Sequence, residues 1–378
     1  MEAISIVNYL SIALTLVYVI VVITFIRGWH RIALYKNIKT TAKTRVSILV
    51  AARNEEAHIG KTITDLLAQN YPTELVEIII INDHSTDDTA TVVTSFSNDG
   101  VLLINLNEDR ALNSYKKKAI QIAIEQAGGD LIITTDADCR MGSNWLSTIV
   151  SFYEEHDFKM ISSPVAYYEE KNLFEKCQTL EFSYLIGLGA STIGSKSPST
   201  CNGANLAYER EAFYAVNGFK GIDDLASGDD ELLLHKIAAK YENKVGFLKN
   251  HDAIVYTYAK ETLSAFIEQR KRWASKSTRY KNKGIVMLGL AIWLFNLSIV
   301  VNGVVGIFLT PFLNVFAFQL SIKLVVEMFF LMGITSFFKR KQLLVLQPLV
   351  STLHIVYMVY IGIAGNSGKY NWKDRMVK

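Results

Sequence analysis

Long apolar stretches lie near both ends of the chain and enclose a region where short apolar runs alternate with polar segments. Residues 4–26 contain no charged side chain and are long enough to cross a bilayer as a helix. A second apolar region predicts three further spans, at roughly 285–309, 312–337 and 343–364. We therefore expect a membrane helix at 1–27, a central domain at 28–284, a membrane region at 285–366 and a basic tail at 367–378.

The charges that flank these stretches predict the orientation of the chain. Only Glu2 precedes the first span, and several basic residues follow it, which places the central domain in the cytoplasm. Lys323 and Glu327, four residues apart within a span, can pair on one helix face and avoid lipid. Four spans would place the carboxyl terminus outside, although its basic residues favour the inside. Either one apolar block is re-entrant or interfacial, or the tail of this multi-pass inner (plasma) membrane protein lies outside.

Within the central domain, apolar runs typical of buried strands alternate with segments of helical periodicity. Strands are predicted at 45–52, 76–81, 101–106, 131–135 and 161–165. Helices are predicted at 57–69, near 117–126, and at 171–188. This β-α-β order predicts an α/β domain with a mostly parallel sheet and right-handed crossovers.

Polar side chains follow three of these strands, at the edge where open α/β sheets bind ligands. The segment 53–55 follows the first strand, Asp83 the second, and Asp136 and Asp138 the fourth. Alternation along a strand sends residues i and i+2 to the same side, so these last two carboxylates can converge on one point. A hard divalent cation with a phosphate-bearing substrate is their natural partner. An ordinary solvated loop is the alternative interpretation.

Composition narrows the class of protein. Half of the 378 residues are hydrophobic and the net charge is +3, which gives no reason to expect a nucleic-acid partner. Cys139, Cys177 and Cys201 are scattered, which fits a reducing compartment and argues against a zinc or disulfide framework. The chain also lacks the glycine-rich turns of dinucleotide binders and P-loops, so a bound nucleotide would need other groups.

Two segments downstream carry further candidate chemistry. Residues 201–208 form a glycine turn before a short strand. Residues 227–230, Ser-Gly-Asp-Asp, place carboxylates before a predicted helix. The helix dipole favours carboxylates there, so Asp229 and Asp230 can be capping residues. Alternatively, a carboxylate at this position can act as a general base on a hydroxyl group.

The segment 269–273, Gln-Arg-Lys-Arg-Trp, stands just before the second membrane region. On a helix, Gln269, Arg272 and Trp273 share one face at i, i+3 and i+4. A guanidinium can neutralise a diphosphate, and an indole offers a face on which a sugar can stack. An Arg-Trp pair beside a span could equally be an interfacial anchor.

In this order the segments resemble those of membrane-bound family 2 glycosyltransferases with a GT-A fold. That family includes cellulose, chitin, hyaluronan and poly-N-acetylglucosamine synthases and ceramide glucosyltransferases. Residues 51–56 resemble its Pro-x-x-Asn-Glu segment, with Ala in place of Pro. Residues 81–87 resemble Asp-Asp-x-Ser-x-Asp, 136–138 match Asp-x-Asp, and 269–273 match Gln-x-x-Arg-Trp. The resemblance covers nearly the whole chain.

The resemblance implies a role for each matching residue. Donor binding falls to Ala51, Arg53, Asn54, Glu55, Asp83, Lys116, Asp136 and Asp138. Among these, Asp83 is expected at the uracil, while Asp136 and Asp138 are expected to hold Mg²⁺ or Mn²⁺. The acceptor side is expected to be lined by Gly203, Asn205, Gln269 and Trp273. The catalytic groups would be Asp230 as the base, Asp229 in support, and Arg272 on the leaving diphosphate.

The implied reaction is inverting, metal-dependent hexosyl transfer from a nucleotide-diphosphate sugar, with a UDP-sugar favoured. The expected acceptor is a growing polysaccharide at the membrane, and the alternative is a glycolipid synthase that adds one sugar to a lipid. Four spans are few for a polymer channel, so polysaccharide synthesis would imply an export subunit. Nucleotidyl transfer and a non-enzymatic membrane scaffold are further alternatives, but neither explains the order of the motifs.

Overall fold

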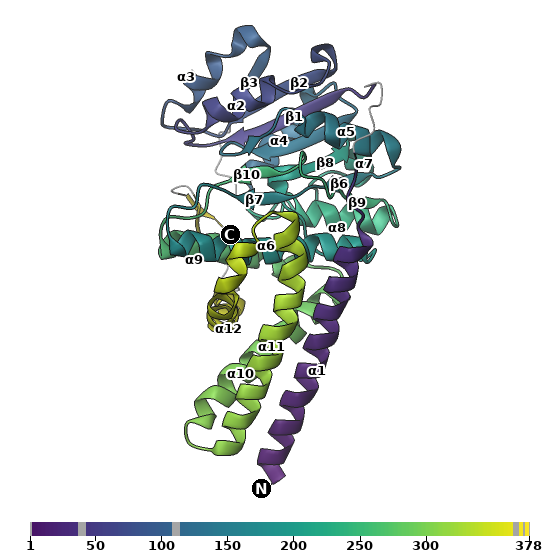
Figure 1. Cartoon of the computed structure of the whole chain (residues 1–378). Coiled ribbons are helices and arrows are strands. Elements are labelled where there is room, and N and C mark those ends of the chain that lie inside the picture. The colour runs from purple at the N-terminus through teal and green to yellow at the C-terminus, as the bar shows by residue number, and fades with distance from the viewer. Residues whose placement is uncertain (1, 37–42, 108–113, 366–369, 373–374, 378) are drawn as a thin grey trace. The chain divides into compact units, whose positions relative to one another are not determined.

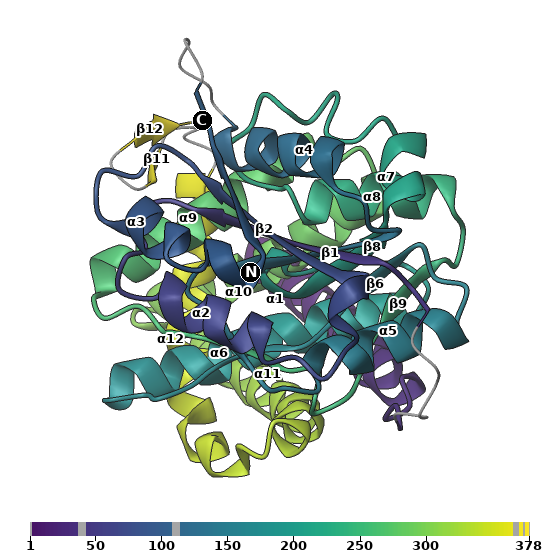
Figure 2. The same ribbon diagram turned by 90° about the horizontal axis from the view of Figure 1, so that it is seen from above.

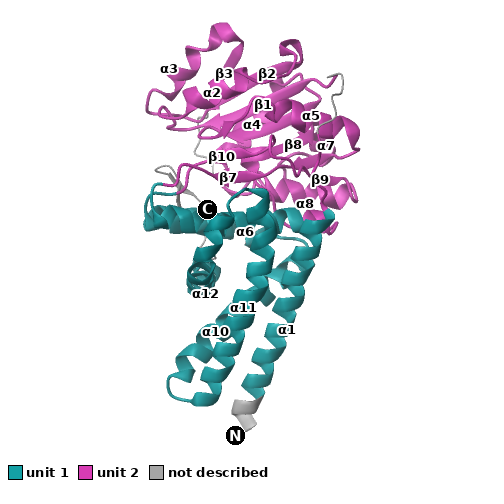
Figure 3. Ribbon diagram, viewed as in Figure 1, with its two compact units in different colours: residues 1–31, 171–191, 260–368 teal, residues 32–170, 192–259, 369–378 magenta. Residues whose placement is uncertain are grey.

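The computed structural model describes residues 2–36, 43–107, 114–365, 370–372 and 375–377. The chain forms two compact units (Figure 3). The helical unit comprises residues 1–31, 171–191 and 260–368, and the sheet unit comprises 32–170, 192–259 and 369–378.

The sheet unit is built on seven strands in the order β3-β2-β1-β4-β8-β6-β9. Their bounds are β1 Val46–Ala52, β2 Val76–Asn82, β3 Val101–Asn105, β4 Leu131–Asp136, β6 Met160–Ser162, β8 Leu206–Glu209 and β9 Val245–Phe247. Strands β1 to β4 pair in parallel, whereas β8 runs antiparallel to both β4 and β6. The predicted α/β class and the first four predicted strands are therefore confirmed.

Helices cover both faces of this sheet, which explains why its strands are almost continuously apolar. They are α2 Ile59–Leu67, α3 Thr89–Thr94, α4 Tyr115–Gln126, α5 Trp145–Glu155, α7 Arg210–Ala215 and α8 Glu231–Lys240. Figure 2 shows α4, α7 and α8 on one side of the strands and α2 and α5 on the other. Between them the side chains of Ile48, Ile79 and Ile132 have no exposed surface.

The single strand expected at 161–165 is wrong, because the chain changes sheets there. Strand β6 ends at Ser162, and β7, Val165–Tyr167, joins a second sheet of order β5-β10-β7. Its other members are β5 Arg140–Met141 and β10 Val255–Thr257. Pro164 has no N–H to donate to a strand ladder, which interrupts pairing at this point. Its carbonyl accepts from the Val255 N–H at 3.1 Å, at the start of the β7–β10 pair.

The helical unit contains α1 Glu2–Arg31, α9 Leu263–Ser275, α10 Lys283–Gly306, α11 Thr310–Phe337, α12 Gln347–Ala364 and most of α6 Leu173–Gly194. Four segments are long and apolar enough to cross a membrane: 6–31, 283–306, 310–337 and 341–364. They match the four blocks predicted from the sequence. Short 3₁₀ helices occur along the chain at Thr73–Leu75, Ser97–Asp99, Gly203–Asn205, Lys276–Arg279 and Lys341–Leu346.

Helix α12 differs in direction from the other three long apolar helices. In Figure 1, α1, α10 and α11 run side by side along the picture, whereas α12 is seen nearly end-on. Figure 2, turned by 90°, shows α12 along its length. The chain then forms a small hairpin of β11 Tyr370–Trp372 and β12 Arg375–Val377. The remaining residues of the basic tail lie outside the described ranges.

Polar side chains fill the interior between α1, α10 and α11. Lys323 pairs with Glu327 one turn away, and the Tyr18 hydroxyl donates to the same carboxylate. Farther along the helices, the Asn302 amide donates to Ser11 and Gln319 at 2.9 and 2.8 Å. Lys323 has no exposed surface, so the predicted pairing of these two residues on one helix face is confirmed and the pair lies within the bundle.

Candidate active site

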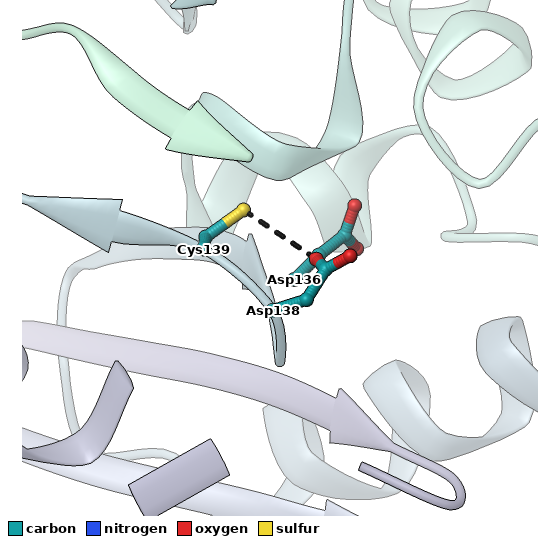
Figure 4. A group of neighbouring side chains, drawn as sticks. All are labelled: Asp136, Asp138 and Cys139. Carbon is teal, nitrogen blue, oxygen red and sulfur yellow. Dashed lines mark hydrogen bonds between the residues drawn. The ribbon is translucent and has the colours of Figure 1, made fainter. Parts of the chain in front are cut away.

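The two carboxylates of the Asp-Ala-Asp segment lie together at the carboxyl end of β4. Asp136 ends the strand opposite Ala51 of β1, and Asp138 follows in the turn. Ligand atoms of Asp136, Asp138 and Cys139 lie within 4.8 Å of one another (Figure 4). The Thr62 hydroxyl of α2 donates to the carbonyls of residues 137 and 139 at 2.8 and 2.9 Å, which fixes the turn.

The chemistry of this group fits a hard divalent cation held by its two carboxylates. Burial raises the pKa of the Cys139 thiol, and the neighbouring carboxylates raise it further. The thiol is therefore neutral, and Mg²⁺ or Mn²⁺ prefers oxygen ligands. Because the Asp136 side chain is 40% exposed, a phosphate-bearing ligand could approach it.

Lys116, near the start of α4, contacts both Asp136 at the end of β4 and Asp229 in the loop before α8. Its ammonium lies 2.8 Å from Asp136 and 3.2 Å from Asp229. Burial alone would lower the pKa of Lys116, but the surrounding carboxylates raise it well above its usual range. Lys116 therefore stays charged and offsets the repulsion between carboxylates that converge from β4 and the 223–230 loop.

Asp230 caps helix α8 and also contacts the 203–205 turn. One carboxylate oxygen accepts from the Glu231 N–H at 2.6 Å, and the other accepts from the Gly203 N–H at 3.1 Å. A Cβ atom on Gly203 would lie 3.3 Å from the Asp230 Cβ and 3.4 Å from an Asp229 oxygen. The close approach explains why glycine suits position 203. The capping role is confirmed, and the assignment of Asp230 as a base stays a prediction.

Lys117 holds the same loop, and no sequence motif singles it out. Its side chain is 1% exposed, and its ammonium donates to the carbonyls of Leu225 and Ser227 at 2.6 Å each. The Ser114 hydroxyl donates to the carbonyl of Asp223. The first turn of α4 therefore anchors the loop that carries Asp229 and Asp230. In the run of three lysines at 116–118, the family resemblance singles out Lys116, and the fold alone distinguishes Lys117 from Lys118.

The segment 53–55 and the 82–89 loop are joined by hydrogen bonds at the neighbouring strand ends. One Arg53 nitrogen donates to the carbonyls of Asp83 and His84 at 3.0 and 2.7 Å. The Asn54 side chain accepts from the Thr86 N–H at 2.9 Å, and the Glu55 N–H donates to the Thr89 hydroxyl at 2.8 Å. These contacts give Arg53, Asn54 and Glu55 a structural function at the predicted donor edge.

Asp83 is less open than a residue expected to contact uracil. Its side chain is 2% exposed, and the carboxylate lies 3.0 Å from Nδ1 of His84. The neighbouring side chain of His84 is 33% exposed. A base contact by Asp83 remains a prediction that requires this loop to adjust.

The side chain of Asn205, which is expected on the acceptor side, is buried in this structure. Asn205 has no exposed surface, and its amide donates to the carbonyls of Pro164 and Ala253 at 2.8 Å each. Its oxygen accepts from the Trp145 indole at 3.0 Å. With these bonds made in the core, Asn205 holds the second sheet against α5 and has no surface left for an acceptor.

The segment 269–273 lies on α9, in the helical unit. Gln269, Arg272 and Trp273 are all partly exposed. Within that unit, the Arg270 guanidinium carbon lies 4.2 Å from the centre of the Trp273 ring. One face of the indole is therefore already covered by a neighbour that the sequence did not single out.

Comparisons with known proteins agree with this geometry. Residues 47–216 match the family model "Glycosyl transferase family 2". A poly-beta-1,6-N-acetyl-D-glucosamine synthase of Staphylococcus aureus is 26% identical over 236 residues, covering 61% of this chain and 53% of that protein. A beta-monoglucosyldiacylglycerol synthase of Synechocystis is 27% identical over 239 residues, covering 62% and 48%. The matched region thus spans about half the length of these curated relatives.

A solved structure shares the fold over most of the chain. It is a mannosyltransferase from Pyrobaculum calidifontis in complex with GDP-Man and Mn²⁺. The TM-score is 0.57 at 17% identity, with 93% of this chain and 99% of that chain covered. The sheet unit therefore has a GT-A-like architecture, and its residues 47–216 match the model of glycosyl transferase family 2.

Proposed function

We propose that the protein is a membrane-bound, inverting, metal-dependent glycosyltransferase that uses a nucleotide-diphosphate sugar, with a UDP-sugar favoured. The observation that carries the proposal is the position of Lys116 between Asp136 and Asp229. This single ammonium contacts Asp136, a predicted ligand of the metal, and also the loop that carries the predicted base, Asp230. Direct transfer needs the donor diphosphate and the acceptor hydroxyl on opposite sides of one anomeric carbon, so the groups that bind them must lie close together.

Donor binding is assigned to the carboxyl ends of β1, β2 and β4. Asp136 and Asp138 would hold Mg²⁺ or Mn²⁺, which supplies positive charge to the diphosphate. Lys116 adds a fixed ammonium beside the same carboxylates and can move to a phosphate oxygen when they bind the cation. The loops at 53–55 and 82–89, tied together by hydrogen bonds, form the nucleotide end of the site.

The acceptor is activated by Asp230 in this mechanism. Backbone N–H groups of Gly203 and Glu231 hold both carboxylate oxygens in place. The carboxylate takes the proton of the acceptor hydroxyl as the oxygen attacks the anomeric carbon from the face opposite the leaving group. The new glycosidic bond forms as the bond to the diphosphate oxygen breaks, so the anomeric configuration inverts. Arg272 stabilises the charge on the departing nucleotide diphosphate.

The direction of α12 supports a membrane arrangement that fits all the flanking charges. We assign α1, α10 and α11 as crossing helices, and α12 as a helix that lies along the cytoplasmic surface. Its exposed apolar side chains recur at helical spacing on one stripe, at Leu349, Leu353, Val356, Tyr360 and Ile363. With three crossings, both the basic segment 339–341 and the basic tail stay on the cytoplasmic side.

The filled interior between α1, α10 and α11 favours a second candidate, the synthesis of a glycolipid. Side chains of Lys323, Glu327 and Tyr18, and of Asn302 and Gln319, occupy the space between these helices. A polysaccharide passing through one copy of this bundle would have to displace them. A lipid acceptor needs no such passage, whereas polymer export would need a partner subunit.

The test is a donor screen on the purified protein in lipid nanodiscs with Mn²⁺. We expect one UDP-sugar to release UDP, and Asp138→Asn to lose metal-dependent UDP binding in calorimetry together with turnover. A ladder of products would identify a polymerase, and a single lipid adduct a glycolipid synthase. Release of pyrophosphate would indicate nucleotidyl transfer, and absence of metal-dependent UDP binding in the wild-type protein would indicate a scaffold; either overturns the proposal.

A further inference from the structure

A buried ion pair lies at one of the two positions that the Gln-x-x-Arg-Trp pattern leaves open. Arg270 of α9 is 2% exposed and Glu181 of α6 is 8% exposed. Nε of Arg270 donates to one Glu181 oxygen at 3.1 Å, and Nη2 donates to the other. This two-point contact fixes the plane of the guanidinium, which a single contact would leave free to turn.

The rest of the same guanidinium contacts two side chains of the pattern itself. Nη1 of Arg270 donates to the Gln269 side-chain oxygen at 2.6 Å. The guanidinium carbon lies 4.2 Å from the centre of the Trp273 ring and 4.5 Å from that of Phe266. The plane fixed by Glu181 therefore sets the orientation of the Gln269 amide and of the Trp273 indole.

Arg272, two residues farther on, is arranged differently. It is partly exposed, and among the described residues no hydrogen bond or ion pair of its guanidinium is found. The two arginines of the segment thus have separate surroundings. Arg270 is enclosed by protein groups, whereas Arg272 is available to an anion.

We propose that Arg270, held by Glu181, is a positioning residue that orients Gln269 and Trp273 toward the acceptor. The proposal rests on the function proposed above, together with the place on the acceptor side that the family resemblance implies for these two residues. A pair that served only to tie α6 to α9 would need no contact with either of them. The geometry instead places one rigid, planar cation against both.

Steady-state kinetics on the donor found in the screen separate these two roles. Glu181→Gln keeps the shape of the side chain but removes its charge, so the guanidinium loses its fixed plane. We expect kcat to fall about 10- to 100-fold, as slight misplacement of a reacting group does, with little change in the donor KM. Glu181→Asp, which keeps the carboxylate, should recover part of kcat.

The matched control is Glu268→Gln, on the same helix. It removes the more exposed ion pair between Glu268 and Lys271, whose atoms lie 3.0 Å apart. The control should keep wild-type kcat and KM. A Glu181→Gln enzyme with unchanged kcat, or one that loses activity only in proportion to lost folded protein, overturns the proposal.

A second measurement does not depend on activity. In protein labelled with 5-fluorotryptophan, the Trp273 resonance is assigned by its loss in Trp273→Phe. We expect Glu181→Gln to shift or broaden that resonance, and Glu268→Gln to leave it unchanged. An unaltered Trp273 resonance in folded Glu181→Gln protein contradicts the proposal. If the wild-type protein transfers no sugar, the proposed function fails while this spectrum still decides whether the ion pair orients Trp273.

Discussion

The ammonium of Lys116 lies 2.8 Å from a carboxylate oxygen of Asp136. In the metal-free protein, Lys116 therefore supplies the positive charge that a divalent cation would supply when it binds there. The same ammonium also reaches Asp229 at 3.2 Å. Lys116 would thus compete with the cation for Asp136. It also connects Asp136 to the loop that carries the proposed base, Asp230.

Removal of this charge is expected to have opposite effects on metal binding and on transfer. In Lys116→Met, Asp136 loses its competing cation, so Mn²⁺ should bind the donor-free protein about 10-fold more tightly. Transfer should nevertheless fall, because the ammonium no longer stabilises the diphosphate. Titration followed by electron paramagnetic resonance measures the first effect, and UDP release the second.

The matched control for this change is Lys118→Met on the same helix. Lys118 is partly exposed, so the variant removes an equal charge without touching the carboxylates. Its Mn²⁺ affinity should stay close to that of the wild-type protein. Equal or weaker Mn²⁺ binding by Lys116→Met would show that Lys116 does not compete for the metal site.

Lys117 is expected to matter for stability as well as for rate. Lys117→Met leaves the carbonyls of Leu225 and Ser227 without their buried donor. The free energy of unfolding should drop by about 2–4 kcal/mol, measured by denaturant unfolding in detergent. The folded fraction should bind UDP and Mn²⁺ normally but transfer slowly, because the 223–230 loop is no longer fixed. A loss below about 0.5 kcal/mol, as for an ordinary surface position, would rule out this anchoring role.

Lys323 and Glu327 should show strong coupling in the membrane bundle. Lys323→Met alone leaves a buried carboxylate without its cation, and we expect a cost of about 3–5 kcal/mol. Adding Glu327→Leu removes that uncompensated charge, so the double variant should be more stable than Lys323→Met. Unfolding in mixed micelles measures all four members of this double-mutant cycle. Additive losses would mean that the two side chains contribute independently.

The parts of the fold that sequence could predict are those with a local signal. Strand β4 is an apolar run that ends in a carboxylate, and both features are visible in residues 131–136. The four long apolar helices follow in the same way from their length and apolar composition. The break between β6 and β7 does carry a local signal, Pro164, which interrupts the strand predicted at 161–165.

The long-range contacts in the candidate site and in α9 are not indicated by any local sequence pattern. Arg270 meets Glu181 across 89 positions, and Lys117 meets Ser227 across 110. In each case the residue types occur throughout the chain, and only the tertiary packing determines which two residues meet. Asn205 shows the converse, since the motif is present but its amide is used in the core. The motifs therefore predict where the site lies, while the fold shows which side chains within each motif are buried and which are exposed.

The most direct measurement is a comparison of donor binding and turnover in Asp230→Asn. The account predicts that UDP binds with Mn²⁺ as in the wild-type protein, because Asp136 and Asp138 are intact, while transfer falls about 1,000-fold. Asp224→Asn, an exposed carboxylate of the same loop, is the control and should retain activity. Wild-type turnover by Asp230→Asn with the correct acceptor would contradict the assignment of Asp230 as the base.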